Sequence, residues 1–326
     1  MTRALRLLTW HVHGSYLWYL SHLPHEIFLP VRPGRPEGYG GRLPGFQWPA
    51  NLHDVAAEDV RGMQFDAVLT QSHRNWEIDR EEILSPAQRR LPRLHLEHDP
   101  PLLHPTEQPH PVDDPGALLI HVTGFNQLMW DARRTPTRVI EHGVTVPEDA
   151  RWTGEVPRGI TVVNDLPTRG RRIGADVFER ARAAVPIDLV GMGSSAMGGL
   201  GEVPLARLPG LAARHRFFFN PIRYTSLGLA VCEAMMAGVP IVGLATTEMS
   251  TAIQNGVNGY VDTREEALHA HMRRLLADPE EARALSAGAA RIARERFGIG
   301  RFIDDWNDAL AEAIGIGAPA RGALHA

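Results

Sequence analysis

Residues Asn220 to Gly243 read Asn-Pro-Ile-Arg-Tyr-Thr-Ser-Leu-Gly-Leu-Ala-Val-Cys-Glu-Ala-Met-Met-Ala-Gly-Val-Pro-Ile-Val-Gly, and the rest of the second half is interpreted around them. The apolar run from Phe217 to Phe219 predicts a strand before this stretch, and a loop then leads into an apolar helix over Leu227 to Ala237. A Gly-x-Pro turn follows the helix and precedes a buried strand, Pro240 to Gly243. Strand, helix and strand in this order form the repeating unit of a parallel sheet.

The same alternation continues outward along the chain. Further strands are predicted at 160–163 and 187–190, and helices at 174–184, 265–277, 280–297 and 301–313. In the first half, short apolar runs between polar residues, Pro or Gly predict strands at 5–12, 67–70, 93–96, 118–122 and 138–140. The Pro-rich segments 30–49 and 100–115 are predicted loops. The predicted fold class is α/β, with two Rossmann-type parallel-sheet domains.

The domain boundaries are predicted from the polar segment that separates the two series of strands and helices. The polar segment from Pro147 to Arg158 is the predicted linker. We therefore expect an N-terminal domain over 1–148, a second domain over 149–300, and a helix with a tail over 301–326. Because parallel sheets bind ligands at the carboxyl ends of their strands, we expect a ligand in a cleft between the two domains.

Composition excludes several classes of protein. Of the 326 residues, 44% are hydrophobic and 22% are charged, which is ordinary for a globular protein. The net charge of -4 gives no reason to expect nucleic-acid binding. The single cysteine, Cys232, excludes a disulfide framework. No signal peptide is recognised, and the apolar stretch 228–245 contains Glu233 and Pro240, so we expect a cytoplasmic protein.

The loop before the apolar helix is a candidate anion site, because a helix N-terminus offers free N–H groups and a partial positive charge. Glu233 lies within this helix, and a buried carboxylate without a partner is costly, so Glu233 either faces a ligand or pairs with an arginine. Lysine is absent, because all 34 Lys and Arg residues are Arg. Phosphate contacts would therefore come from Arg, His, hydroxyl or N–H groups.

The quoted stretch resembles the donor-binding motif of retaining, nucleotide-sugar-dependent glycosyltransferases with the GT-B fold, a large bacterial group acting on lipids and polysaccharides. The family pattern runs Pro, three residues, Glu, two residues, Gly-Leu, three residues, then Glu-Ala-Met-Ala-x-Gly-x-Pro-Val-Val. The matching positions are Pro221, Gly228, Leu229, Glu233, Ala234, Met235, Gly238, Pro240, Ile241 and Val242. The segment 251–261 resembles the next motif of the family. The resemblance covers the second half well and the first half weakly.

The resemblance implies roles for this loop and helix. Glu233 would bind the ribose hydroxyls of the donor nucleotide. The diphosphate would meet the N–H groups of Ser226, Leu227 and Gly228. Thr225 stands where the family has a Glu that contacts the transferred sugar, so we assign Thr225 to the catalytic site and expect a different donor sugar. Glu248 either supplies part of the missing contact or is a surface residue.

Phosphate contacts are also implied just after the first strand of the second domain, where the family uses an Arg and a Lys. This chain has Asn164 near the expected Arg position, followed by a basic turn. The predicted donor-binding arginines are Arg169, Arg171 and Arg172, which could engage a diphosphate bidentately. The alternative is a solvated turn. Gly193, after the strand 187–190, is a further donor-binding candidate.

In the first half, the segment 94–99, Leu-His-Leu-Glu-His-Asp, resembles the inter-domain His motif of the family. It implies a catalytic His98 at a strand tip beside the transferred sugar, oriented by Asp99, and a turn cap is the alternative. Gly14 matches the Gly-rich loop that follows the first strand of the family, and we assign it to donor binding. The aromatic run 16–19 either stacks on an acceptor sugar or packs in the core.

Histidine is concentrated in the first half, where 12 of the 16 lie at or before His142. His95, His98, His104 and His110 are close in sequence, but their spacings match no zinc pattern. The intervening prolines are expected to keep these side chains apart. No metal site and no cofactor are therefore predicted.

The resemblance as a whole implies a glycosyltransferase that moves a sugar from a nucleotide-diphosphate donor to a glycan, lipid or small-molecule acceptor. Retention of configuration and independence of metal are expected. The first domain would carry the acceptor side, and the last helix would cross back to it. Two alternatives stay open: a GT-B-fold nucleotide-sugar epimerase, and a degenerate binding protein without catalysis. Peripheral contact with the inner face of a membrane is a further expectation.

Overall fold

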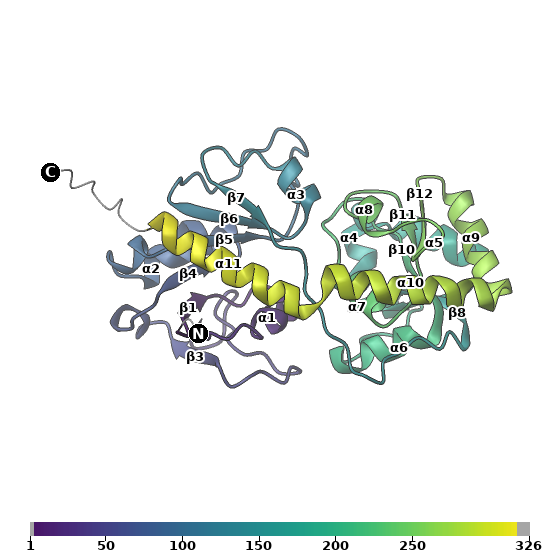
Figure 1. Cartoon of the computed structure of the whole chain (residues 1–326), viewed down its shortest axis with the longest axis horizontal. Coiled ribbons are helices and arrows are strands. Elements are labelled where there is room, and N and C mark those ends of the chain that lie inside the picture. Colours follow the sequence, from purple (N-terminus) through teal and green to yellow (C-terminus); the bar gives the residue numbers. More distant parts are fainter. Residues whose placement is uncertain (1–2, 318–326) are drawn as a thin grey trace. The chain divides into compact units, whose positions relative to one another are not determined.

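The computed structural model describes residues 3–317 and divides into two compact units (Figure 1). Unit 1 contains the chain up to Glu141 together with the chain from Gly300 onward, and unit 2 is His142–Ile299. Residues 318–326, which belong to the predicted C-terminal tail, lie outside the described residues.

Unit 1 is built on a parallel sheet whose described strands follow the order β3-β2-β1-β4-β5-β6-β7. The strands are β1 (Arg6–Thr9), β2 (Glu26–Val31), β3 (Leu52–Ala56), β4 (Ala67–Thr70), β5 (Arg93–Glu97), β6 (Ala117–His121) and β7 (Thr137–Val139). The strand order reverses between β1 and β4, where Leu8 is in register with Val68. Doubly wound sheets bind their ligands outside the carboxyl ends of the strands at such a reversal.

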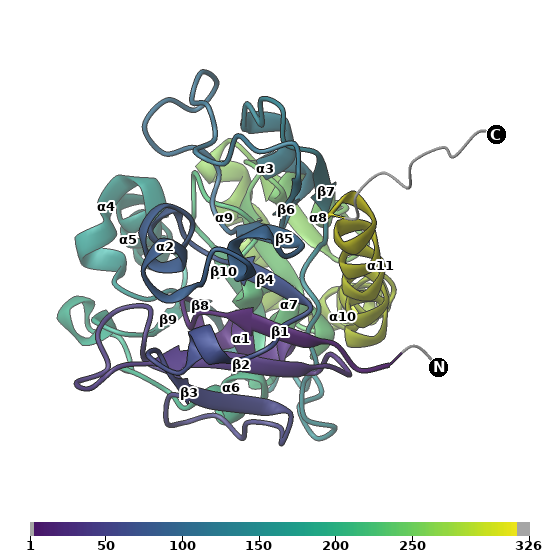
Figure 2. The same ribbon diagram turned by 90° about the vertical axis from the view of Figure 1, so that its left-hand side faces the viewer.

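Helices cover this sheet, and the long α11 (Ile299–Gly317) runs along unit 1 (Figure 1, Figure 2). The indole Nε1 of Trp306 on α11 donates to the Tyr16 hydroxyl at 3.3 Å, and Arg138 on β7 forms an ion pair with Glu312 at 3.1 Å. The remaining helices are α1 (Gly14–Leu20), α2 (Arg80–Ile83) and α3 (Gly124–Met129), with short 3-10 or π turns at 60–62, 75–79 and 88–90. The predicted helix over 301–313 lies within α11.

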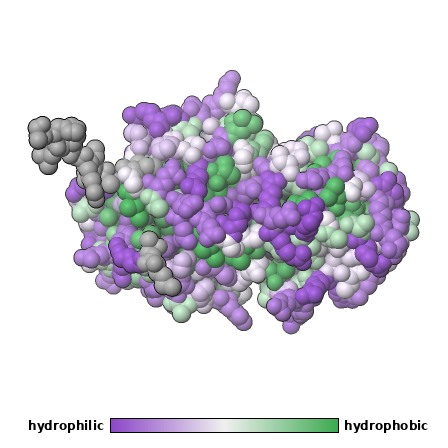
Figure 3. Space-filling model, in the orientation of Figure 1, coloured by the Kyte–Doolittle hydropathy of each residue, from purple (hydrophilic) through white to green (hydrophobic). Residues whose placement is uncertain are grey.

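The core of unit 1 is apolar on both faces of the sheet. Every residue of β4 and β6 is buried, as strands of parallel sheets usually are. Tyr16 and Tyr19 on α1 are also buried, so for these two aromatic residues the core alternative is confirmed. On the face drawn in Figure 3, hydrophilic and hydrophobic residues are interspersed. None of the described helices combines the length and the apolar character needed to cross a bilayer.

Unit 2 has a second parallel sheet, in which the described strands follow the order β12-β11-β10-β8-β9. The strands are β8 (Val156–Val162), β9 (Ile187–Val190), β10 (His215–Asn220), β11 (Ile241–Leu244) and β12 (Gly259–Asp262). The helices are α4 (Leu166–Ile173), α5 (Ala175–Ala184), α6 (Leu208–Arg214), α7 (Leu229–Met236), α8 (Met249–Ala252), α9 (Glu265–Ala277) and α10 (Pro279–Phe297). This is the flavodoxin-like order, which reverses between β8 and β10.

The boundary between the units differs from the predicted one after residue 148. Val144 forms a parallel bridge with Gly298, and its N–H donates to the carbonyl of Phe297 at 2.8 Å. Within the predicted linker, the Trp152 N–H donates to the carbonyl of Ala237 at 2.8 Å, and its indole packs on the core of unit 2. The segment 142–158 therefore belongs to unit 2, because these hydrogen bonds and the Trp152 ring attach it there.

Gly174, between α4 and α5, provides a test of how tightly unit 2 is packed. Its φ is 86°, and a Cβ on it would lie 2.0 Å from the carbonyl oxygen of Pro221. Gly198 has the same left-handed backbone, with φ of 69° and ψ of 26°, but no heavy atom within 4 Å of such a Cβ, so it is a matched control. We expect Gly198→Ala to cost about 1–2 kcal/mol of unfolding free energy for the left-handed backbone alone. Gly174→Ala should cost roughly 3 kcal/mol or more, because the backbone must also move. Urea denaturation measures both losses, and equal losses would contradict the close approach.

Candidate functional site

At the carboxyl edge of unit 2, the loops after β8 and β9 are joined. The N–H of Asp165 donates to the carbonyl of Met192 at 2.8 Å. Gly191 approaches the backbone of Val163 so closely that a Cβ would lie 2.5 Å from its carbonyl oxygen. Gly193 follows in a left-handed conformation with φ of 70°. The structure thus places the candidate Gly193 beside the end of β8, and its contact with a donor stays a prediction.

The loop after β10, residues 221–228, is held against the end of α4. The N–H groups of Arg223 and Tyr224 donate to the carbonyl of Arg172 at 3.1 and 3.3 Å. The Arg223 guanidinium also donates to both carboxylate oxygens of Asp176, at 2.5 and 2.7 Å. This hydrogen bonding lowers the pKa of the Asp176 carboxyl well below its usual value. The loop after β10 therefore contacts the helices that follow β8, and the strand order of the sheet reverses between these two strands.

The three candidate arginines have different surroundings. Arg169 is exposed, and its Nη1 lies 3.5 Å from a carbonyl oxygen of the loop after β8. Arg172 is half-buried, and its Nη1 lies 3.5 Å from the carbonyl oxygen of Tyr224. Arg171 is exposed and forms an ion pair of 2.8 Å with Asp176 on α5. The side chain of Arg169 thus lies beside the loop after β8 and that of Arg172 beside the loop after β10. The side chain of Arg171 instead pairs with α5.

The loop 221–228 leads into α7, which begins at Leu229 after the N-cap Gly228. The helix predicted for 227–237 is therefore present with ends one or two residues shorter. Glu233 is buried on this helix, with 4% of its surface exposed. The ring of His142 donates from Nε2 to the carbonyl oxygen of Leu227 at 2.7 Å. His142 therefore holds the loop, a role that the sequence did not indicate because the contact joins residues 85 positions apart.

Two further candidates of the same edge have different environments. Thr225 is partly exposed in the loop 221–228, as is Ser226. Glu248 precedes α8 and is buried, with an ion pair of 2.6 Å to Arg296 on α10 and a hydrogen bond from the Thr251 hydroxyl. The surface alternative for Glu248 is therefore wrong. Its carboxylate joins α8 to α10.

In unit 1, His98 comes directly after β5, at the strand tip where it was predicted. Its Nε2 donates to Oε1 of Gln71 at 3.3 Å. The Gln71 amide in turn donates to the Thr9 hydroxyl and to a carbonyl at the end of β1, both at 2.9 Å. The His98 ring also packs edge-on against His13 and Tyr16, with centroids 4.4 and 4.9 Å apart. Gln71 is the orienting residue that the sequence did not indicate.

Asp99 and Gly14 lie near this histidine in the chain and in the fold. The N–H of Asp99 donates to Oε1 of Glu97 at 2.9 Å, and its carbonyl accepts from the Trp130 indole at 2.8 Å. Its orienting action on His98 stays a prediction. Gly14 is the first residue of α1, and a Cβ on it would lie 3.2 Å from the Phe46 ring. Close packing is thus one reason for a glycine there.

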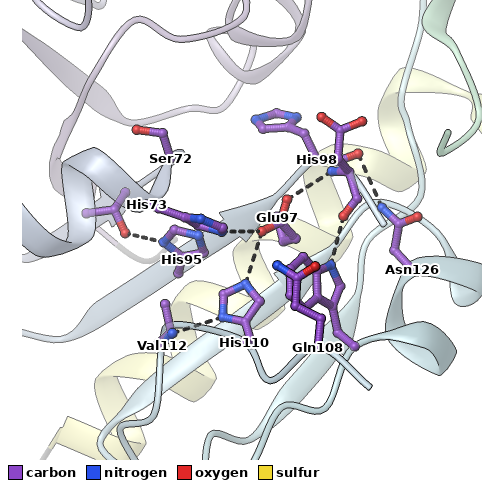
Figure 4. Close-up of polar contacts among 12 residues, drawn as sticks. Ser72, His73, His95, Glu97, His98, Gln108, His110, Val112 and Asn126 are labelled. Carbon is purple, nitrogen blue, oxygen red and sulfur yellow. Dashed lines mark hydrogen bonds and ion pairs between the residues drawn. The ribbon is translucent and has the colours of Figure 1, made fainter. Parts of the chain in front are cut away.

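A group of ionisable side chains also converges at the carboxyl edge of unit 1: the half-exposed His73 and the buried His95, Glu97 and His110 (Figure 4). The expectation that prolines keep the histidines apart is wrong for His95 and His110, whose ring centroids lie 5.3 Å apart. The reason is that the chain returns to the same edge, where the His110 N–H donates to the carbonyl of Asp131 at 2.8 Å. The signal in the sequence was Glu97, a carboxylate within an apolar strand that needs a partner.

A comparison with known protein families matches a segment of unit 2. Residues 180–278, which include β10, the loop 221–228 and α7, match the family described as glycosyl transferases group 1. The chain is similar to D-inositol 3-phosphate glycosyltransferase of Thermobispora bispora, with 38% identity over 82 residues. That similarity covers 24% of this chain and only 18% of the length of the relative.

Solved structures resemble the chain over nearly its whole length. Sucrose-phosphate synthase from Thermosynechococcus elongatus has a TM-score of 0.68 and 15% identity, covering 96% of this chain and 100% of that one. The Anabaena protein HepE, solved in complex with UDP, has a TM-score of 0.67 and 15% identity, covering 95% and 100%. At this identity the likeness concerns the fold. The predicted α/β fold of the GT-B type, with two parallel sheets, is confirmed.

His121, at the end of β6, makes the stability of unit 1 depend on pH. Its side chain is fully buried, and among the described residues neither ring nitrogen has a hydrogen-bond partner. Burial lowers the pKa of His121 to about 4, so the unfolded chain binds the proton more tightly. The stabilising contribution is complete above the unfolded pKa of ~6.5 and is lost as the pH falls toward 4, by about 2 kcal/mol at pH 5.

We therefore expect His121→Leu to remove this penalty and to flatten the decline of melting temperature between pH 7 and pH 5. The exposed His104→Leu is the control and should follow the wild type. Thermal melts at both pH values measure the effect. A His121→Leu protein that loses as much stability as the wild type would show that another group controls the decline.

Proposed function

We propose that the chain is a glycosyltransferase that moves a sugar from a nucleotide-diphosphate donor to an acceptor. The observation that carries this proposal is the contact of the loop after β10 with the end of α4, which follows β8, because β8 and β10 are the strands at which the order of unit 2 reverses. Ligands of doubly wound sheets bind at that position. The loop after β10 and α7 also lie within the segment that matches glycosyl transferases group 1.

The donor would bind unit 2 through its nucleoside diphosphate, the class to which the UDP bound by the similar HepE belongs. The N–H groups at the start of α7 and the side chains of Arg169 and Arg172 supply positive charge for the diphosphate. Glu233 would accept hydrogen bonds from the ribose hydroxyls. Gly193 would allow the donor to approach the backbone after β9.

The reaction would proceed with retention and without a metal ion on the diphosphate. Arginine side chains and helix N–H groups would stabilise the charge that develops on the departing diphosphate. We assign His98, held by Gln71 and oriented by Asp99, to the transfer step in unit 1, and Gly14 to donor binding. Thr225 offers a short neutral hydroxyl in place of a carboxylate, so the donor sugar would differ from common hexoses. A glycan, a lipid or a small molecule would be the acceptor, and no nucleic acid is expected.

A panel of nucleotide sugars tests the activity directly. The full-length protein should bind one nucleoside diphosphate class and hydrolyse or transfer the matching sugar slowly. Thr225→Glu should lower that activity while binding of the bare nucleoside diphosphate stays nearly unchanged. Conversion of the donor into an isomeric nucleotide sugar without an acceptor would instead identify an epimerase. If Thr225→Glu creates transfer where the wild type shows none, the chain is a degenerate binding protein.

Contacts to the ribose and contacts to the diphosphate can be distinguished by comparing the affinity of each variant for a nucleoside with its affinity for the corresponding nucleoside diphosphate. Glu233→Gln should weaken both ligands similarly, by ~1–3 kcal/mol, because a charge-assisted bond to the shared ribose is weakened. The double variant Arg169→Ala, Arg172→Ala should weaken the diphosphate far more than the nucleoside. Arg171→Ala, which removes only an exposed ion pair to α5, is the control and should change neither.

Isothermal titration calorimetry measures these affinities in proteins whose folding is checked by thermal melting. Equal weakening of nucleoside and diphosphate by the arginine pair would place these side chains away from the phosphates. Unchanged affinity in folded Glu233→Gln would remove the ribose contact.

A further inference from the structure

Four side chains of unit 1 bring nitrogen and oxygen atoms together at the ends of β4 and β5 (Figure 4). His95 and Glu97 lie two residues apart on β5 and therefore on the same face. His73 comes from the loop after β4, and His110 from the loop after β5. One ligand atom from each of these four residues lies within 4.8 Å of all the others.

One ring nitrogen of His95 has no hydrogen-bond partner among the described residues and belongs to this group. The Thr70 hydroxyl donates to the carbonyl of Leu94 at 3.2 Å and lies 2.8 Å from Nδ1 of His95. The hydroxyl therefore accepts from Nδ1–H, and Nε2 is the atom with the free lone pair. This Nε2 is fully buried and has no hydrogen-bond partner among the described residues. A proton on Nε2 would have no acceptor among the described residues, so these contacts favour the neutral ring with its proton on Nδ1.

In His110 the ring proton is on the other nitrogen, Nε2, and both ring nitrogens form hydrogen bonds. His110 is therefore not a metal ligand. Its Nδ1 accepts the N–H of Val112 at 3.0 Å, so its proton is on Nε2. That Nε2–H donates to Oε2 of Glu97 at 3.0 Å. A ring whose second nitrogen accepts a hydrogen bond would have to become an imidazolate to bind a metal. His110 is therefore a partner that orients the Glu97 carboxylate.

Glu97 and His73 are the remaining two members of this group. The Glu97 side chain is buried, and it accepts hydrogen bonds from His110 and His73 on Oε2 and from the Asp99 N–H on Oε1. Three donors directed at one carboxyl group favour the carboxylate anion. Nε2 of His73 lies 3.2 Å from its Oε2, and the His73 side chain is 44% exposed. A solute can reach the group from the side of His73, whereas the other ligand atoms are buried.

We propose that His73, His95 and Glu97 form a binding site for a divalent transition-metal ion of the zinc class, with Thr70 and His110 as orienting partners. Two imidazole nitrogens and one carboxylate are a ligand set that zinc accepts, whereas magnesium and calcium prefer oxygen alone. The ion would satisfy the lone pair of His95 and neutralise Glu97. When Nε2 of His73 binds the ion, its hydrogen bond to Glu97 is lost and the single proton of the neutral ring is carried by Nδ1.

The site is independent of the function proposed for unit 2. Glu97 also accepts the N–H of Asp99 at 2.9 Å, so a bound ion would fix the end of β5 next to His98. The ion would therefore act on the structure of unit 1 and would not replace the arginines proposed to bind a diphosphate. Binding of metal and binding of a nucleotide can be measured separately.

The test uses the full chain, freed of metal by a chelator and then titrated with zinc in a calorimeter. We expect one zinc ion per chain and a raised melting temperature. Cobalt should give the visible absorption bands of a four- or five-coordinate nitrogen and oxygen site. His73→Ala should abolish these signals, and because His73 is half-exposed the fold should survive. Thr70→Val should weaken binding by about 10- to 100-fold, since it removes the partner of His95.

His104→Ala is the matched control, because His104 is an exposed histidine of the same region outside the group. It should bind zinc like the wild type. Zinc binding that His73→Ala leaves unchanged would overturn the proposal. Absence of zinc binding to the folded wild type would also overturn it and would leave a hydrogen-bond network of His73, His110 and Glu97.

Discussion

The candidate site of unit 2 depends on one close approach, that of the loop after β10 to the end of α4. Gly174 leaves room for the Pro221 carbonyl, and Arg223 reaches across to Asp176. Both contacts join elements that follow β8 and β10, the two strands at which the sheet changes direction. A substitution that separates them would displace the loop after β10 from α4 and α5, because this loop has no regular element of its own.

The sequence predicted best where local signals and tertiary packing agree. The strand, loop, helix and strand around Asn220–Gly243 appear with ends shifted by one or two residues, because an apolar core helix and a Gly-x-Pro turn are local features. It missed β2 and β3, because Pro30 interrupts one and polar residues such as His53 occupy the other. It missed α4 for a similar reason, since Pro167 and Gly170 there indicate a turn.

Side-chain partners across long stretches of chain were less predictable. Glu233 and Glu97 could be recognised as carboxylates within apolar elements, but the structure was needed to find the partners of Glu97 in His73 and His110. The same holds for the contact of His142 with Leu227 and for the ion pair of Glu248. Such contacts depend on which loops share an edge of a sheet, and this follows from strand order and not from spacing.

The position of α11 also bears on how the chain folds during synthesis. Unit 2 is continuous, whereas unit 1 takes residues from both sides of it. On the ribosome, unit 2 can therefore become complete before the residues of α11 emerge. Until then the part of unit 1 already made lacks Phe302 and Trp306, which pack against Tyr16. Nascent unit 1 thus leaves the Tyr16 side of its core without Phe302 and Trp306 for the time needed to translate unit 2, and these contacts form only after α11 has been made.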